Sequence, residues 1–154
     1  MAKNKLIIPL LILVLMVIVL YWQFFLLGKI PLPADLLVGA YYPWLDYKWG
    51  YTVGVPVKNP LISDVFSQFF VWKYLGLDLI KSGKLPLWNS FSFSGTPLLA
   101  TYHSAVLQPF NFLLLLPNYA GWGLYIFGQT VMAAVGMYLL LAFYGINRPL
   151  SRIS

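Results

Sequence analysis

Residues 59–70 read NPLISDVFSQFF and residues 84–97 read KLPLWNSFSFSGTP, and both lie in a segment, residues 57–117, that is too polar to lie in lipid. One long apolar run stands on each side of this segment, residues 6–27 before it and residues 119–144 after it. A helix over the first run would be roughly 33 Å long, which matches a hydrocarbon core of about 30 Å. This order of segments predicts two transmembrane helices joined by a long loop.

Composition places the chain among integral membrane proteins. Hydrophobic residues make up 60% of the chain and charged residues only 9%, whereas a soluble domain carries roughly 25% charged residues. The absence of cysteine excludes a disulfide framework and a thiolate metal site. The net charge of +6 comes from scattered basic residues that form no patch, so the sequence predicts no nucleic-acid partner.

Basic residues at both ends of the chain predict the side of the membrane that the loop faces. Those that flank the two apolar runs are Lys3, Lys5, Arg148 and Arg152. Both termini, residues 1–5 and 145–154, are therefore expected in the cytoplasm, and the loop, residues 28–118, outside. The lysines of the loop do not change this expectation, because loops beyond about 60 residues cross largely regardless of charge.

Each apolar run has an alternative interpretation. A cleaved signal peptide in place of the first span would have an apolar region of about 7–15 residues and small residues at the cut. The run here is longer and ends in FFLLGK, so an uncleaved anchor is the expectation. In the second run, Gly128, Ala133 and Gly136 form a small-residue strip suited to close helix contact, although membrane helices tolerate glycine in any case.

The first part of the loop is expected to form turns near the membrane surface. Residues 28–56 contain prolines and glycines that break every long helix. Aromatic residues are interleaved with them, and their amphipathic rings favour the membrane interface. They are Tyr41, Tyr42, Trp44, Tyr47, Trp49 and Tyr51.

The second part of the loop is expected to contain interfacial helices. Residues 63–82 have a polar and an apolar side at helical spacing, with Ser63 as the expected N-cap and Gly83 as the expected stop. Residues 86–97 are predicted to form a loop held by Trp88, Phe91 and Phe93. Residues 98–116 are apolar but interrupted by Pro109, which predicts two short interfacial or re-entrant helices, with a full span as the alternative.

Carboxylates are the side chains of this loop best suited to catalysis. The acidic residues are four aspartates, Asp35, Asp46, Asp64 and Asp78. A carboxylate can hold a divalent cation against a lipid phosphate or take a proton from an acceptor hydroxyl. Asp64 is the best-placed candidate, because it opens the predicted helix with Gln68 one turn on. The alternative is that Asp64 only caps the helix.

The other polar candidates have weaker patterns. Asp35 follows the first span closely, so it either faces a site at the membrane surface or is a turn residue. Asp78 stands beside Lys81 and is expected to be a solvated helix end. His103 is the only histidine of the chain, and one histidine makes no metal site by itself. It either binds substrate or forms a hydrogen bond at the membrane interface.

Three stretches together resemble the first external loop of YfhO-type bacterial membrane proteins, relatives of the GT-C glycosyltransferases. They are residues 59–73, which include the Asp-x-x-x-Gln pattern, residues 82–89 (SGKLPLWN) and residues 94–100 (SGTPLLA). The resemblance implies an all-α membrane protein of the bacterial inner membrane, of which this chain would be an N-terminal fragment or a truncated product. The remaining spans would come from its parent chain or from a partner subunit.

The resemblance also implies an activity. Members transfer sugars from polyprenyl-phosphate donors at the outer face, so membrane lipid and a lipid-linked sugar donor are the expected partners. Asp64 matches the acid of the loop pattern and would serve as catalytic residue or as ligand of a divalent metal ion. Asp35 matches only by position the acid that follows the first span. The candidate substrate-binding residues are Gln68, Trp88, Asn89 and His103. The alternative is a non-enzymatic membrane module whose aromatic loop binds lipid headgroups or a partner subunit.

Overall fold

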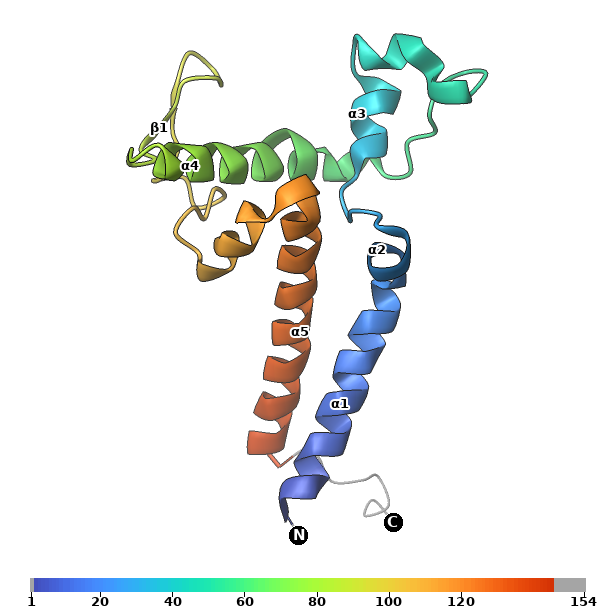
Figure 1. Ribbon diagram of the computed structural model, residues 1–154, viewed down its shortest axis with the longest axis vertical. Helices are drawn as coiled ribbons and strands as arrows, with labels where there is room; N and C mark the ends of the chain where they lie inside the picture. Colours follow the sequence, from blue (N-terminus) through green and yellow to red (C-terminus); the bar gives the residue numbers. More distant parts are fainter. Residues whose placement is uncertain (1, 146–154) are drawn as a thin grey trace. The chain divides into compact units, whose positions relative to one another are not determined.

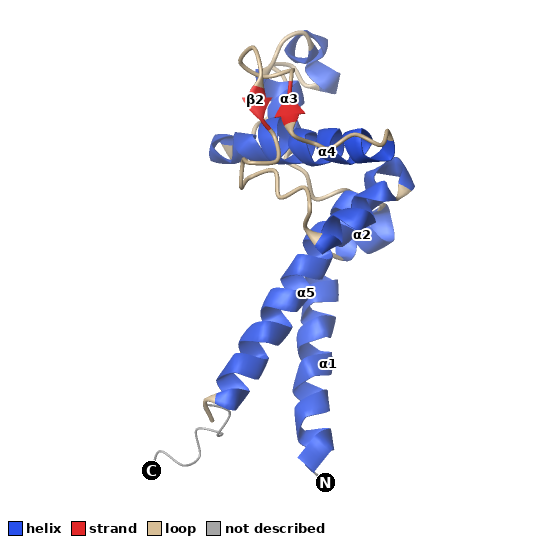
Figure 2. Cartoon of the chain, turned by 90° about the vertical axis from the view of Figure 1, so that its left-hand side faces the viewer, coloured by secondary structure: helices blue, strands red, loops and turns tan. Residues whose placement is uncertain are grey.

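The computed structural model describes residues 2–145, and its side chains from Ile7 onward. The chain is mostly helical, and one helix of the described residues, Pro117–Phe143, is long and apolar enough to cross a membrane. This composition of elements is compatible with an all-α membrane protein. Figure 2 shows the short strands in red among the helices. The arginines expected to mark the cytoplasmic end of the second span lie outside the described residues.

Two compact units make up the chain. The span unit combines Met1–Ile30 with Leu116–Ser154, and the loop unit is Pro31–Leu115. The segments that were predicted to lie in the membrane therefore belong to one unit, and most of the predicted external loop forms the other.

The first apolar run of the span unit forms two consecutive helices, α1 (Ala2–Leu20) and α2 (Trp22–Leu27). They are separated at Tyr21, whose backbone leaves the helical region (φ −97°, ψ 21°) while its N–H still donates to the Val17 carbonyl at 3.1 Å. α2 ends at Gly28, which has the left-handed conformation (φ 64°) that favours glycine at a helix terminus. The helical run therefore ends where the sequence predicts, but a break divides it.

The second apolar run is α5 (Ala120–Phe143), preceded by the short 3-10 helix η5 (Pro117–Tyr119). α5 lies against α1 (Figure 1). Tyr21 Oη and Thr130 Oγ1 form a hydrogen bond of 2.9 Å between the two apolar runs. The closest glycine contact is Gly123, where a Cβ atom would lie 2.1 Å from the Phe24 ring. Gly136, in the predicted small-residue strip, has no neighbour within 4 Å of a built Cβ, so it makes no such contact in this unit.

The loop unit begins with α3 (Ala34–Ala40) and the 3-10 helix η1 (Trp44–Gly50). Residues 55–58 return alongside α3, and the approach is close enough that a Cβ atom at Gly39 would lie 2.5 Å from the Val55 carbonyl oxygen. The aromatic residues between these two segments keep much of their surface exposed, from 42% for Trp44 to 73% for Tyr42.

A long helical segment follows, made of the 3-10 helix η2 (Pro60–Ile62), the π-helix η3 (Val65–Phe70) and α4 (Val71–Lys81). Its start differs from the prediction. Asn59 caps it through Oδ1, which accepts from the Leu61 N–H at 3.0 Å, whereas Ser63 already has helical dihedral angles (φ −56°, ψ −32°). Ser63 is therefore not the N-cap, and the predicted helix begins three residues earlier.

The helical segment stops as expected. Gly83 has a φ of 73°, its N–H donates to the Ile80 carbonyl at 2.9 Å, and the N–H of Lys84 donates to the Leu79 carbonyl at 2.9 Å. This pair of bonds is the Schellman arrangement, in which a left-handed residue satisfies the last free carbonyls of a helix.

The remainder of the loop unit is less helical than predicted. β1 (Trp88–Asn89) and β2 (Thr96–Pro97) form a small antiparallel hairpin, shown at one end of α4 in Figure 1. Phe91 and Phe93 are 84% and 94% exposed, so they do not hold this loop as expected. Within residues 98–116 the helical part is the 3-10 helix η4 (Pro109–Leu115), in which Pro109 is the first residue rather than an interruption.

The core of the loop unit is small and lies where α4 meets the chain after the hairpin. Its buried apolar side chains are Leu77, Leu98, Val106 and Leu114, and Leu36 is buried separately in α3. α4 packs closely against residue 106 in this core, because a Cβ atom at Gly76 would lie 2.7 Å from Val106 Cγ1.

Candidate functional site

The helical segment of the loop unit carries three candidate side chains at four-residue spacing: Asp64, Gln68 and Trp72. Gln68 Nε2 donates to Asp64 Oδ1 at 3.3 Å, and the Asp64 side chain is exposed. Asp64 makes no capping hydrogen bond to the backbone of η3, which begins directly after it. π-helical turns are rare in proteins as a whole, and those that occur are often found at functional sites. The exposed Asp64 carboxylate can therefore be reached from solvent while it accepts from Gln68.

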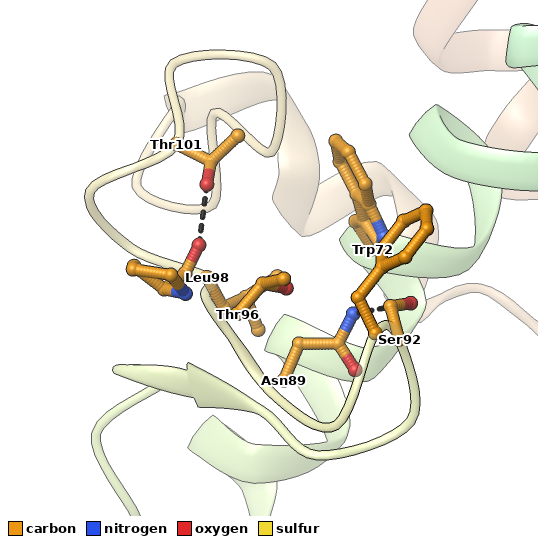
Figure 3. Close-up of a pocket in the computed structure, with 8 residues that line it drawn as sticks. Trp72, Asn89, Ser92, Thr96, Leu98 and Thr101 are labelled. Atoms are coloured by element: carbon orange, nitrogen blue, oxygen red, sulfur yellow. Dashed lines mark hydrogen bonds between the residues drawn. The ribbon is translucent and has the colours of Figure 1, made fainter.

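Trp72 lines a cavity with a volume of about 300 Å³, whereas Asp64 and Gln68 are not among its lining residues. Figure 3 shows the Trp72 ring from α4 facing side chains of the hairpin and of the chain that follows it. The residues that line the cavity are Trp72, Asn89, Ser92, Phe93, Thr96, Pro97, Leu98 and Thr101. An aromatic ring, an amide and several hydroxyl groups thus meet in one concave surface.

Asn89 fixes the geometry of the hairpin beside this cavity. It is 2% exposed, its Oδ1 accepts from the Phe91 N–H at 2.9 Å, and its Nδ2 donates to Ser92 Oγ at 3.1 Å. Strand alternation points the preceding residue, Trp88, to the opposite face, where it is 53% exposed. The Trp88 ring lies over Gly95, at which a Cβ atom would be 2.5 Å from Trp88 Nε1. Only glycine leaves room for this contact.

Two hydroxyl groups after β2 bond to the chain itself. Thr101 Oγ1, in the cavity wall, donates to the Pro97 carbonyl (Figure 3), and Ser104 Oγ, which is fully buried and outside the lining, donates to the Leu98 carbonyl at 2.6 Å. These bonds order the segment that forms one wall of the cavity.

The wall of this cavity is mainly apolar. Two of its polar side chains bond within the protein: the Asn89 amide to the Phe91 N–H and Ser92 Oγ, and the Thr101 hydroxyl to the Pro97 carbonyl. Small-molecule sites in general are mostly apolar with a few placed polar groups. A volume of about 300 Å³ suits a small group only.

The structure separates the other predicted site residues from this cavity. Asp35 Oδ2 accepts from the Lys58 N–H at 2.9 Å, and this bond joins α3 to the end of the aromatic segment that follows it. His103 is exposed and its ring lies 5.7 Å from that of Phe69. Of the predicted substrate-binding residues, Asn89 lines the cavity and Trp88 borders its hairpin.

A metal ion at Asp64 would have few protein ligands. Among the described residues, no group of three or more histidines, aspartates or glutamates is close enough to hold one. Asp64 and the amide of Gln68 are the available donors, and Mg²⁺ commonly binds through one or two carboxylates together with waters and substrate phosphate. The role of Asp64 as metal ligand stays a prediction.

Lys73 is the polar residue that sequence reasoning missed. It is 4% exposed, and its Nζ donates to the Ser104 carbonyl at 3.2 Å and to Asn111 Oδ1 at 3.5 Å. Burial lowers the pKa of Lys73 from its ordinary value. A signal was present, because Lys73 occupies the apolar side of the helical pattern, between Phe69 and Leu77.

No protein-family model, curated protein or solved structure matches this chain. Function is therefore inferred from the residues and their geometry.

Proposed function

We propose that this chain is the amino-terminal part of a YfhO-type, GT-C-like membrane protein that transfers or modifies sugars, taking them from a polyprenyl-phosphate donor at the outer face of the bacterial inner membrane. One observation carries the proposal: the Asp64–Gln68 pair and Trp72, which lines the cavity, lie on the same helical segment. A group that binds a sugar ring and a group that binds phosphate, metal or proton stand on one rigid element.

The spacing of these groups suits a glycosyl phosphate. Asp64 and Trp72 are eight residues apart, with Gln68 halfway. That would be about 12 Å along an α-helix axis, and it is somewhat less here because residues 65–70 form a π-helix with a smaller rise per residue. With the sugar ring in the cavity, its phosphate would extend along the helix toward Gln68. Asp64 would then hold a divalent cation against the phosphate or accept the proton of the attacking hydroxyl.

The membrane arrangement belongs to the same proposal. α5 supplies one helix long enough to span, and α1 with α2 supplies the second, ending at Leu27. Both termini are then cytoplasmic and the loop unit is external, as the positive-inside rule indicates for the basic ends of the chain. A donor carried by the outer leaflet reaches the loop unit without crossing the bilayer.

A second function is favoured by a separate observation. The aromatic residues between Tyr41 and Tyr51 are all at least 42% exposed, and amphipathic rings of this kind bind at lipid headgroups. A non-enzymatic membrane module would use this surface and would have no need of Asp64 or of the cavity.

Replacing Asp64 separates the two functions. In the full-length parent, Asp64→Asn keeps the size and hydrogen-bonding capacity of the side chain but removes the charge. We expect it to abolish sugar transfer while expression and membrane insertion remain normal. Asp78→Asn is the matched control, because Asp78 is an exposed aspartate on the same helical segment, 3.9 Å from Lys81. Wild-type transfer by Asp64→Asn would exclude the catalytic role.

A further inference from the structure

A second concave surface of the loop unit lies between α4 and η4 and has a volume of about 280 Å³. Its wall is mainly apolar and includes Ile80, Leu107, Phe112 and Leu115. Leu107 and Phe112 are 72% and 73% exposed. Lys81, at the end of α4, supplies the charged group at this groove.

The polar side chain inside the groove is already satisfied by the protein. Asn111 Nδ2 donates to the Ala105 carbonyl at 2.6 Å and to the Val106 carbonyl at 2.8 Å, and its Oδ1 accepts from Lys73 Nζ. The groove therefore suits a ligand with an apolar chain. A charged group of that ligand would lie outside the apolar wall.

In sequence, this groove directly precedes the helix that is long and apolar enough to cross a membrane. Leu115 is two residues before Pro117, the first residue of the helix Pro117–Phe143, so their Cα atoms lie within about 7 Å of one another. A helix of 27 residues is about 40 Å long, which exceeds a hydrocarbon core of about 30 Å and reaches the headgroup region. Leu115, in the wall of the groove, is thus joined to the end of that helix by a short connection.

We propose that the groove binds one acyl chain of an anionic phospholipid of the surrounding bilayer, with its phosphate at Lys81. Lys81 Nζ lies 3.9 Å from Asp78 Oδ1, but both side chains are more than half exposed. A surface ion pair of this kind contributes little, so a phosphate can take its place. The proposal goes beyond sugar transfer and does not depend on it.

Photo-crosslinking in vesicles tests the proposal. The chain is reconstituted with phosphatidylglycerol or phosphatidylcholine that carries a diazirine in one acyl chain, and the labelled residues are mapped by mass spectrometry. We expect label on Ile80 and on residues 107–115, several-fold stronger from phosphatidylglycerol. Label spread equally over these residues and over Leu85, which is 75% exposed and outside the groove, would overturn the proposal.

Matched variants identify the two parts of the site. Lys81→Gln should remove the preference for phosphatidylglycerol, whereas Lys84→Gln, with the same charge change outside the groove, should keep it. Leu107→Ser should reduce labelling of the groove, whereas Leu85→Ser should not. Equal effects within either pair would overturn the proposal, as would stronger labelling of the groove by a diazirine-bearing polyprenyl phosphate. Loss of sugar transfer in the Asp64→Asn parent has no bearing on these outcomes.

Discussion

Gly76 offers a sharp test of the packing that positions α4 in the loop unit. A Cβ atom there would lie 2.7 and 2.8 Å from the two γ-methyl groups of Val106, but 3.4 Å from Val106 Cβ. Gly76→Ala gains about 1 kcal/mol of helix propensity and meets an overpacking cost of about 1–3 kcal/mol. The net change is a destabilisation of about 0–2 kcal/mol.

Removing the γ-methyl groups should reverse this sign. In a Val106→Ala background the nearest Val106 atom that remains is in ordinary contact, so Gly76→Ala should stabilise α4 by its helix propensity. The coupling between the two sites is then about 1–3 kcal/mol, or about 5- to 150-fold.

Amide hydrogen exchange of α4 (Val71–Lys81) measures this coupling, with wild type, both single variants and the double variant compared in the same detergent. The coupling should appear as the corresponding ratio of protection factors. An equal effect of Gly76→Ala on the two backgrounds would refute the close approach of α4 to Val106.

Three further predictions concern the stop of the helix, the buried lysine and the topology. Gly83→Leu should destabilise the end of α4 by about 1–2 kcal/mol through the backbone alone, since a Cβ there meets nothing within 4 Å; Gly83→Asn should cost less in the same exchange experiment. Burial lowers the pKa of Lys73 in the folded chain below 10.5. Between that folded-state pKa and 10.5 the unfolded chain therefore binds more protons than the folded chain. The free energy of unfolding should consequently rise with pH over that interval. Urea titrations should show this rise in wild type and not in Lys73→Met. A cysteine at exposed Ser90 should react with an impermeant thiol reagent outside sealed cells; a cysteine at Ser151 should not, and labelling there would contradict the orientation.

The longer helices and their ends could be predicted from the sequence. Both apolar runs form helices, and the ends at Gly28 and Gly83 follow from left-handed glycines that directly succeed helical patterns. The early start of the helical segment also had a signal, because Asn59 followed by Pro60 is a cap with proline at the first helical position. Ser63 fits a cap pattern as well, because Asp64 follows it and an acidic residue suits the first turn of a helix.

The candidate site could be predicted only in part. Asn89 and the Asp64–Gln68 pair were identified, but the cavity depends on a hairpin whose strands have two residues each, too short for any alternating pattern. Trp72 and Thr101 are 29 positions apart, and their meeting depends on tertiary packing. The role of Asp35 in binding the Lys58 N–H likewise depends on a return of the chain that local spacing does not show.

Binding of a lipid-linked sugar to the Trp72 cavity tests the central claim most directly. The chain in nanodiscs is titrated with polyprenyl-phosphate glucose and with polyprenyl phosphate lacking the sugar, for wild type, Trp72→Leu and, as a control outside the cavity, Trp49→Leu. The account predicts that wild type and Trp49→Leu bind the glycosylated lipid at least tenfold more tightly than the bare one, a preference of about 1.4 kcal/mol, and that Trp72→Leu loses this preference. Equal affinity of wild type for the two lipids, or an unchanged preference in Trp72→Leu, would contradict it.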